Sequence, residues 1–285
     1  MTAPPAGPGP TKVAYQGEPG AYSEEAVLVL FPDAEPVGVR SFADAASALE
    51  GGSVAKAVLP VENSLAGIVQ EVNDLLWERT LVTVTMEYAH PVRHCLLGRG
   101  GPVERAASHP QALGQCRRWL EAHGIEAIPF YDTAGAARWV AEGAPPGTAA
   151  IAGRAAARHY GLEVLAGDIQ DQASNRTRFL LLQRRDGADP GAPWAAARNG
   201  WKASLAFSAA HVPGSLALAL EPFSKRGVNL TRLDSRPIPE RPFNYLFYLD
   251  FQVEDPGAAQ DCLDDLRKRA VEVRLFGVYP VRGSD

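Results

Sequence analysis

The stretch from Asn175 to Phe179 places an amide, a hydroxyl and two guanidinium groups in five consecutive residues. The apolar run Leu180-Leu181-Leu182 follows directly and is typical of a strand buried on both faces. In open α/β sheets, polar groups at strand ends face the ligand crevice. Arg178 offers a planar fork that suits a carboxylate, and Thr177 offers an orientable donor. The structural alternative is a loop with solvated arginines that caps the strand.

A similar polar turn follows the short strand that we predict over residues 12–15. Two glycines, Gly17 and Gly20, lead to Tyr22 and Ser23, after which the apolar spacing predicts a helix. Glycines allow the backbone to approach a ligand closely, and Ser23 is placed to cap the helix, whose free amides attract anions. The stretch lacks the lysine of a phosphate loop, so a plain turn explains the glycines equally well.

Two more polar turns repeat this layout. The strand predicted over residues 56–61 leads to Glu62, Asn63 and Ser64, and the segment after residue 107 begins Ser108-His109-Pro110-Gln111. Ser108 and Gln111 have the spacing of a capping box, so a structural role also explains them. A single histidine in the first turn of a helix is likewise more often structural than catalytic.

The composition is that of a globular protein with a small-molecule partner. The chain has 285 residues, 46% of them hydrophobic, and a formal net charge of −5. This length favours two domains, and the charge without a long basic tract argues against nucleic-acid and membrane partners. No metal-ligand cluster stands out in the sequence, and we expect neither a metal nor a cofactor.

The cysteines and the amino-terminal residues bear on the compartment. Cys95, Cys116 and Cys262 are scattered within apolar patterns, which predicts reduced core residues. Residues 1–10 form a Pro/Gly/Ala stretch without the pattern of a signal peptide or an anchor. From these features we expect a cytoplasmic protein.

The elements that must position the polar turns alternate between strand and helix up to residue 166. This alternation predicts an α/β fold with mostly parallel sheets in two lobes, and a cleft between the lobes. The pattern then changes at a stretch rich in Gly, Ala, Pro and Asn, after which a βαββαβ order predicts a ferredoxin-like domain. The expected organisation is a disordered tail over 1–11, a catalytic domain over 12–185, a linker over 186–200 and a small domain over 201–281.

Several of these motifs, in this order, closely resemble those of prephenate dehydratases. The resemblance spans Lys12 to Pro280, and its second part is similar to the phenylalanine-binding elements of an ACT regulatory domain. It implies a catalytic domain with the two-lobed fold of type 2 periplasmic binding proteins. Because only eleven residues precede the first predicted strand, the chain looks monofunctional, without a fused chorismate mutase. The motifs are Gly20-Ala21-Tyr22-Ser23, Pro60-Val61-Glu62-Asn63-Ser64 with Gly67, His94-Cys95-Leu96-Leu97, Ser108-His109-Pro110-Gln111 with Cys116, Asn175-Arg176-Thr177-Arg178-Phe179, Gly214-Ser215-Leu216 and Leu233-Asp234-Ser235-Arg236-Pro237.

The resemblance implies a reaction in phenylalanine biosynthesis in which prephenate loses carbon dioxide and water to give phenylpyruvate. We expect Thr177 to contact the leaving hydroxyl and Arg178 to hold a carboxylate, with Glu62 as a third catalytic residue. Glu62 and His109 are alternative proton donors, because hydroxide is a poor leaving group. The expected substrate-binding residues are Tyr22, Ser23, Asn63, Ser64, Ser108, His109, Gln111, Asn175 and Phe179.

The ACT resemblance implies feedback regulation by L-phenylalanine at a contact between ACT domains in a homodimer or homotetramer. One departure is Asp234, where the family usually has glutamate, so the affinity for the effector or its identity can differ. Two alternatives stay open: the substrate could be arogenate, or the chain could be a two-lobed binding protein without catalysis. The expected effector-binding residues are Gly214, Ser215, Leu216, Asn229, Leu233, Asp234, Ser235, Arg236 and Pro237.

Overall fold

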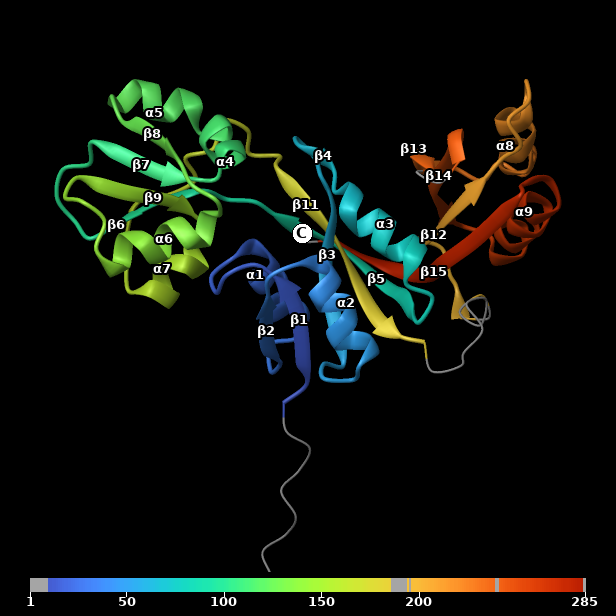
Figure 1. Cartoon of the computed structure of the whole chain (residues 1–285), viewed down its shortest axis with the longest axis horizontal. Helices are drawn as coiled ribbons and strands as arrows, with labels where there is room; N and C mark the ends of the chain where they lie inside the picture. The colour runs from blue at the N-terminus through green and yellow to red at the C-terminus, as the bar shows by residue number, and fades with distance from the viewer. Residues whose placement is uncertain (1–9, 186–193, 195, 239–240, 284–285) are drawn as a thin grey trace, which may run out of the picture. The chain divides into compact units, whose positions relative to one another are not determined.

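The computed structural model describes residues 10–185, 194, 196–238 and 241–283, and Figure 1 shows their arrangement. The chain divides into two compact units. One contains the described residues up to Val69 together with Ala89–Phe179, and the other contains Gln70–Tyr88 together with the described part of Leu180–Gly283. Most of the predicted tail and linker lies outside the described residues, and the predicted domain boundaries remain predictions.

The first lobe of the first unit is a largely parallel sheet. Strand β1 lies between β2 and β3 and is parallel to both, β11 lies on the other side of β3, and the short β4 pairs with β3 in the antiparallel direction. The elements are β1 (Lys12–Gln16), α1 (Tyr22–Leu30), β2 (Glu35–Val39), α2 (Phe42–Glu50), β3 (Lys56–Asn63), β4 (Gly67–Ile68) and β11 (Arg176–Arg184).

The second lobe is a five-stranded sheet in the order β10-β6-β9-β7-β8 with helices on both faces. Side chains alternate across it: Leu97 packs with α6 and α7, whereas Leu96 packs with α4 and α5. The elements are β6 (Cys95–Gly98), β7 (Arg105–Ser108), α4 (Pro110–Gln115), α5 (Arg117–His123), β8 (Glu126–Pro129), α6 (Thr133–Glu142), β9 (Thr148–Ala152), α7 (Arg154–Tyr160) and β10 (Glu163–Ala166).

Local chemistry explains where the helices of the first unit begin. Ser41 caps α2 with a capping box, in which Ser41 Oγ accepts from the Asp44 amide and the Asp44 carboxylate accepts from the Ser41 amide. Ser23, which we expected to cap α1, instead lies inside this helix, because the cap position falls on Ala21. Gly20 has a φ of 86°, and a Cβ there would lie 2.7 Å from the backbone of Ala156. This glycine therefore allows close packing onto α7.

The second unit contains the predicted βαββαβ fold. Its strands lie in the order β13-β14-β12-β15, which is the ferredoxin-like arrangement, and β5 extends this sheet beside β15. Helices α8 and α9 pack on one face against alternate apolar residues of β12 and β14. The elements are α3 (Gln70–Glu78), β5 (Val82–Pro91), β12 (Trp201–Ser208), α8 (Ser215–Lys225), β13 (Leu230–Ile238), β14 (Arg241–Val253), α9 (Pro256–Arg269) and β15 (Glu272–Gly283).

The three cysteines are free and buried, as the sequence predicted. Burial raises the pKa of all three thiols, and that of Cys116 reaches about 12. Neutral thiols of this kind behave as small apolar core groups rather than as nucleophiles.

Candidate functional site

Polar residues from both lobes of the first unit line one cavity of about 260 Å³. Tyr22 at the start of α1, Asn63 at the end of β3 and Thr177 on β11 come from the first lobe. The segment between β5 and β6 and the first turns of α4 and α6 supply the rest of the wall. The lining residues are Tyr22, Pro60, Asn63, Val69, Val92, His94, His109, Gln111, Ala112, Gln115, Asp132, Thr133 and Thr177.

Asn63 connects the polar turn after β3 to β11. Its side-chain nitrogen donates to Thr177 Oγ1 at 3.0 Å and to Asn175 Oδ1 at 2.9 Å, and Asn175 is fully buried. Its side-chain oxygen accepts from the Leu65 and Ala66 amides, which holds the turn. Because the Thr177 oxygen already accepts a hydrogen bond from Asn63, the hydrogen of its hydroxyl can point into the cavity.

This connection continues across the cavity wall through Gln115 and His94. Asn175 Nδ2 donates to Gln115 Oε1 at 2.9 Å, and His94 Nε2 lies 2.7 Å from the same oxygen. His94 Nδ1 lies 2.8 Å from the Tyr22 hydroxyl. Six side chains, from Thr177 to Tyr22, therefore form one continuous path of hydrogen bonds.

The proton positions on this path follow from burial. Burial lowers the pKa of His94 below its usual value, so the imidazole is neutral near pH 7. Since the Gln115 oxygen can only accept, Nε2 carries the ring proton and Nδ1 is an acceptor. The Tyr22 hydroxyl shares its hydrogen between this Nδ1 at 2.8 Å and the Arg93 carbonyl at 2.9 Å. Burial also raises the pKa of Tyr22, so this hydroxyl stays protonated.

The structure brings most of the predicted substrate residues to this cavity or beside it. Tyr22, Asn63, His109 and Gln111 line it with Thr177, and Asn175 lies directly behind Asn63. Four others have different surroundings. Ser64 Oγ accepts from the Arg176 amide, Ser108 is buried and donates to the Ile151 carbonyl, Phe179 is buried against His90, and Ser23 is buried within α1.

Ser108 does not form the expected capping box with Gln111. The helix cap is His109, whose Nδ1 accepts from the Gln111 amide at 3.3 Å, and Pro110 is the first helical residue. The shift of one residue occurs because β7 continues through Ser108. Because Nδ1 accepts this hydrogen bond, Nε2 is the ring nitrogen of His109 that carries a proton.

Arg178 and Glu62 are not among the described residues that line the cavity. Arg178 Nε lies 3.2 Å from Glu62 Oε2, so the two predicted catalytic residues pair with each other. Successive residues of a strand point to opposite faces, which separates Arg178 from Thr177 on β11. The two side chains therefore lie on opposite faces of β11, and the role of Arg178 at a substrate carboxylate stays a prediction.

Sequence reasoning assigned no role to His94, Gln115, Asp132 or Thr133, which also line the cavity. His94 belongs to a quoted motif, and Gln115 lies four residues after Gln111 and so shares its helix face, which was the available signal. Asp132 caps α6, where its side chain accepts from the Gly135 amide at 2.7 Å. It brings a carboxylate to a wall whose other polar side chains are neutral.

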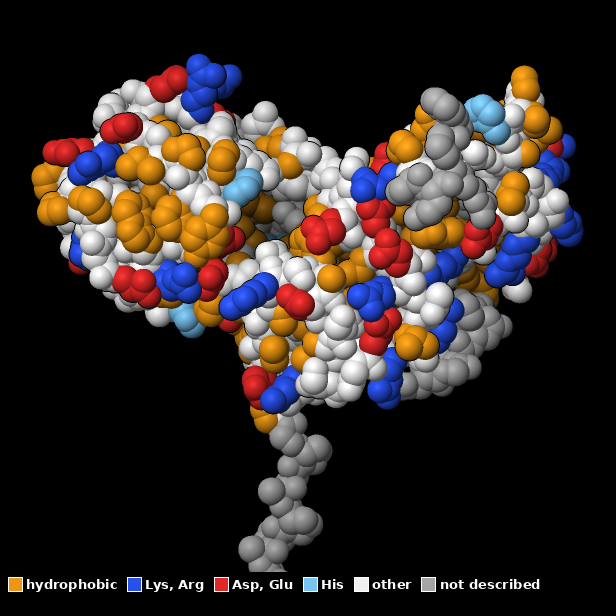
Figure 2. Space-filling model, viewed as in Figure 1, with side chains coloured by type: hydrophobic (Ala, Val, Ile, Leu, Met, Phe, Trp, Pro, Cys, Tyr) orange, Lys and Arg blue, Asp and Glu red, His pale blue; other side chains and the backbone are white. Residues whose placement is uncertain are grey.

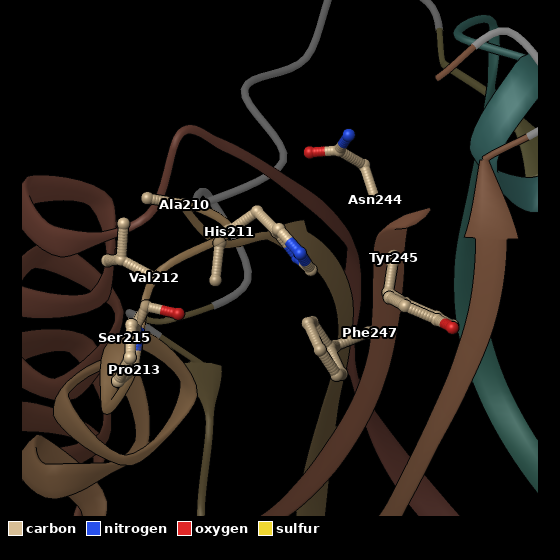
Figure 3. A pocket seen from close by; sticks show the side chains of 9 residues that line it. Ala210, His211, Val212, Pro213, Ser215, Asn244, Tyr245 and Phe247 are labelled. Carbon is tan, nitrogen blue, oxygen red and sulfur yellow. The ribbon is translucent and has the colours of Figure 1, made fainter. Parts of the chain in front are cut away.

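The ferredoxin-like part has a cavity of its own, of about 350 Å³. Figure 3 shows Val212, Pro213 and Ser215 on one side of it, Asn244, Tyr245 and Phe247 from β14 on the other, and His211 between them. Ser215 is the predicted effector residue that lines it.

The other predicted effector residues lie around the start of α8 and along the edge strand β13. Gly214 is the cap of α8 with a φ of 84°, Asn229 donates to the Gln252 side chain, and Arg236 pairs with Asp74. On β13, Leu233 is exposed. These residues form no common cavity with Ser215 among those described.

The visible surface carries mixed charge. On the face shown in Figure 2, Lys and Arg side chains are interspersed with Asp and Glu side chains. Within the described ranges, no group of three or more His, Cys, Asp or Glu side chains is arranged to hold a metal ion. None of the described helices combines the length and the apolar character needed to cross a membrane.

Comparisons with known proteins agree on one family. The family model described as prephenate dehydratase matches residues 13–187. Arogenate dehydratase/prephenate dehydratase 2 of Arabidopsis thaliana, named chloroplastic, is 41% identical over 284 residues, which cover 95% of this chain and 73% of the plant protein.

Two solved structures share the whole fold. A protein described as GqqA, a novel type of quorum-quenching acylase, is 33% identical with a TM-score of 0.86, and the match covers 95% of this chain and 98% of that one. A prephenate dehydratase from Arthrobacter aurescens in complex with L-Phe is 28% identical with a TM-score of 0.84, covering 95% and 90%.

The expected cytoplasmic location is contradicted by the plant relatives. The Arabidopsis thaliana proteins are named chloroplastic, and the expectation is withdrawn. It rested on the absence of a targeting pattern, and such an absence does not identify a compartment.

The family match covers more than half of the chain, and the plant relative matches it over nearly its whole length. The residues that carried the resemblance in the sequence also contribute most of the polar wall of the cavity. The chain therefore belongs to the prephenate dehydratase family, the enzymes that dehydrate prephenate or arogenate in aromatic amino acid biosynthesis.

Proposed function

We propose that this protein converts prephenate to phenylpyruvate, with Thr177 at the leaving hydroxyl. The observation that carries the assignment is the hydrogen bond from Asn63 Nδ2 to Thr177 Oγ1, at 3.0 Å. This bond occupies a lone pair on the oxygen and leaves the hydroxyl hydrogen to be donated into the cavity that Thr177 lines.

The reaction needs a hydrogen-bond or proton donor at the leaving hydroxyl and an electron pair from the bond between the ring and its carboxylate. As the bond from the ring to its carboxylate breaks, carbon dioxide leaves and the electron pair moves through the ring toward the carbon that bears the hydroxyl. The hydroxyl departs with a proton as water, and the ring becomes aromatic. A threonine hydroxyl is too weak an acid to give up its proton, so Thr177 stabilises the departing oxygen by a hydrogen bond.

The final proton has two candidate sources. His109 lines the cavity and carries a ring proton on Nε2, whereas Glu62 does not line it and pairs with Arg178. This geometry supports His109, or water beside it, over Glu62. Gln111 and Thr133 supply neutral donors for the carboxylates of the substrate.

The assignment is tested by three variants. Removing the hydroxyl in Thr177→Val should lower kcat by about 10²- to 10⁴-fold, the range of a positioned donor, while Thr177→Ser should keep most of it. Glu62→Gln should turn over at close to the normal rate. Near-normal turnover by Thr177→Val together with an inactive Glu62→Gln would reverse the roles.

Arogenate is the second candidate substrate, and Asp132 is the observation that favours it. Arogenate carries an ammonium group where prephenate carries a keto group, and Asp132 supplies a carboxylate on the cavity wall. The plant relative carries both activities in its name. Turnover of both substrates side by side by the native protein is the deciding assay.

The variant Asp132→Asn helps to distinguish the two substrates. Asparagine also caps helices well, so this substitution removes the charge and keeps the cap of α6. If prephenate is the substrate, its kcat/KM should hold or rise in this variant. If arogenate is the substrate, the loss of an ion pair should lower its kcat/KM by about tenfold or more.

We also propose that L-phenylalanine regulates the enzyme through the ferredoxin-like part, which is the ACT domain of the sequence resemblance. The Arthrobacter aurescens structure contains L-Phe, which supports this effector. The binding residues proposed are Gly214 to Leu216 and those of the segment from Asn229 to Pro237. Strand β13 lies at a sheet edge, where a second copy could pair with it in a homodimer or homotetramer. Absence of phenylalanine binding in calorimetry on the full chain would exclude the proposal.

A further inference from the structure

A second cavity of about 410 Å³ lies in the first unit, and none of the residues discussed so far as substrate ligands lines it. Its wall combines one face of α1, the segment that enters β6, and one face of α7. Its volume lies within the range of small-molecule sites.

This cavity and the one at Thr177 lie on opposite sides of the same extended segment. Val92 and His94 line the cavity at Thr177, whereas Pro91, Arg93 and Cys95 line the second one. The alternation is that of an extended chain. The two cavities are therefore separate sites that share one backbone segment.

The two acidic groups on the wall of the second cavity are already engaged. Glu25 accepts from the Ala155 amide at 3.0 Å and lies 3.1 Å from His90 Nε2. Asp168 accepts from Arg93 at 3.0 Å, and this pair lowers the pKa of the Asp168 carboxyl. Neither acid is placed to bind the ammonium group of a ligand.

The basic groups of interest on the cavity wall are two arginines of α7. Arg154 and Arg158 lie four residues apart, on one face of the helix, and both line the cavity. In the described part of the chain, neither guanidinium makes a hydrogen bond with another side chain, although Arg154 interacts electrostatically with Asp168 on the same wall. Two guanidinium groups in this position suit one carboxylate.

The opposite wall is apolar and accessible. Leu28 and Val29 on α1 are 40% and 48% exposed, although neighbouring residues of the same helix are buried. Together with Pro91 they give the cavity an apolar side facing the arginines of α7. Isolated exposed apolar residues need no explanation, but two adjacent ones on a cavity wall indicate a contact surface.

We propose that this cavity binds a small organic monocarboxylate with an apolar body and no amino group. The carboxylate pairs with Arg154 and Arg158, and the apolar body packs on Leu28, Val29 and Pro91. This site goes beyond the proposed dehydratase function and does not depend on which substrate the enzyme takes.

The test is a titration of the full-length protein, labelled at its Leu and Val methyl groups, with 3-phenylpropionate, followed by NMR. The Leu28 and Val29 methyl signals should shift in a saturable manner. The double variant Arg154→Gln/Arg158→Gln should weaken this binding by at least about tenfold, because it removes both charge-assisted hydrogen bonds.

Two controls separate this site from the other cavity and from general charge effects. Thr177→Val and Arg117→Gln, the latter an exposed helix residue of the same lobe, should leave the Leu28 and Val29 titration unchanged. Leucine should bind at least about tenfold more weakly than 3-phenylpropionate, because its ammonium group finds no open acid. Shifts confined to the methyl groups of Val69 and Val92, or binding unaffected by the double variant, would overturn the proposal. Turnover of prephenate, measured in parallel, reports on the dehydratase function independently.

Discussion

The neutral His94 ring donates a hydrogen bond to Gln115 through one nitrogen and accepts one from Tyr22 through the other. The Tyr22 hydroxyl therefore supports the tautomer that the Gln115 oxygen selects, and through Gln115 and Asn175 it helps to orient the Asn63 amide that contacts Thr177. Tyr22 is in this respect a positioning residue, in addition to lining the cavity.

Tyr22→Phe removes the hydroxyl and keeps the ring. We expect kcat to fall by about five- to tenfold, which corresponds to the loss of one neutral hydrogen bond of about 1–1.4 kcal/mol. The 15N NMR spectrum of His94 should change from one tautomer to a mixture, which a purely structural role would not produce. Tyr131→Phe, at a 60% exposed tyrosine, is the matched control. An unchanged His94 spectrum in Tyr22→Phe would disprove the positioning role.

His94 also makes stability depend on pH. Its folded-state pKa is lowered by burial, so below about pH 6.5 the unfolded chain binds a proton more readily than the folded chain. The contribution of His94 is therefore present above this pH and is lost as the pH falls toward the folded-state pKa. Urea unfolding from pH 7.5 to 5 should show a steeper loss of stability in the native protein than in His94→Asn. Parallel curves would contradict the expected titration.

At the scale of single elements, the sequence predicted what depends on local order and missed what depends on register. The strand and helix order and the capping box of Ser41 follow from patterns within a few residues. The contact of Asn63 with Thr177 joins segments far apart in the sequence, and only the family resemblance suggested that both belong to one site. The side of β11 that Arg178 occupies depends on which face of this strand is covered, and the cap at His109 depends on how far β7 continues. The contact between His94 and Gln115 joins elements from separate segments, so no local spacing encodes it.

Helix α3 provides an element-scale route for regulation. It follows directly on β4, which pairs with Glu62 and Asn63, and its Asp74 pairs with Arg236 of β13 at 2.5 Å. Phenylalanine bound along β13, as proposed, would alter this pair and with it the start of α3. The pair is partly exposed, so its contribution to stability is small, about 1 kcal/mol or less.

Asp74→Asn should therefore loosen feedback without disabling the enzyme. We expect the phenylalanine concentration for half-inhibition to rise by about fivefold or more, because allosteric coupling energies are typically about 1–3 kcal/mol. Activity without phenylalanine should stay within about twofold. Asp264→Asn removes a comparable surface pair on α9 and should leave inhibition unchanged. Equal inhibition of Asp74→Asn and the native protein would exclude this route.

At the scale of the whole molecule, chain segments that are distant in sequence fold together. The second unit combines residues 70–88 with the ferredoxin-like part, although about 110 residues separate them. The sequence could not show that β5 joins the sheet beside β15, since strand pairing over such a distance leaves no periodic signal. A buried ion pair connects β5 with the ferredoxin-like part: Lys202 Nζ of β12 lies 2.6 Å from Glu87 Oε1 of β5.

Lys202→Met should destabilise the second unit strongly, because it removes the ammonium group that lies 2.6 Å from the carboxylate of Glu87, whose side chain is 3% exposed. Breaking one side of a buried pair lowers the free energy of unfolding by about 3–5 kcal/mol, whereas replacing both charges by uncharged groups is often close to neutral. The double variant Glu87→Gln/Lys202→Met should therefore recover much of the loss in urea unfolding. Lys225→Met, which breaks an exposed pair with Glu221, should cost about 1 kcal/mol or less. If Lys202→Met is no more destabilising than Lys225→Met, the pair does not hold β5 to the sheet, and the apolar contacts of this sheet must join the two segments instead.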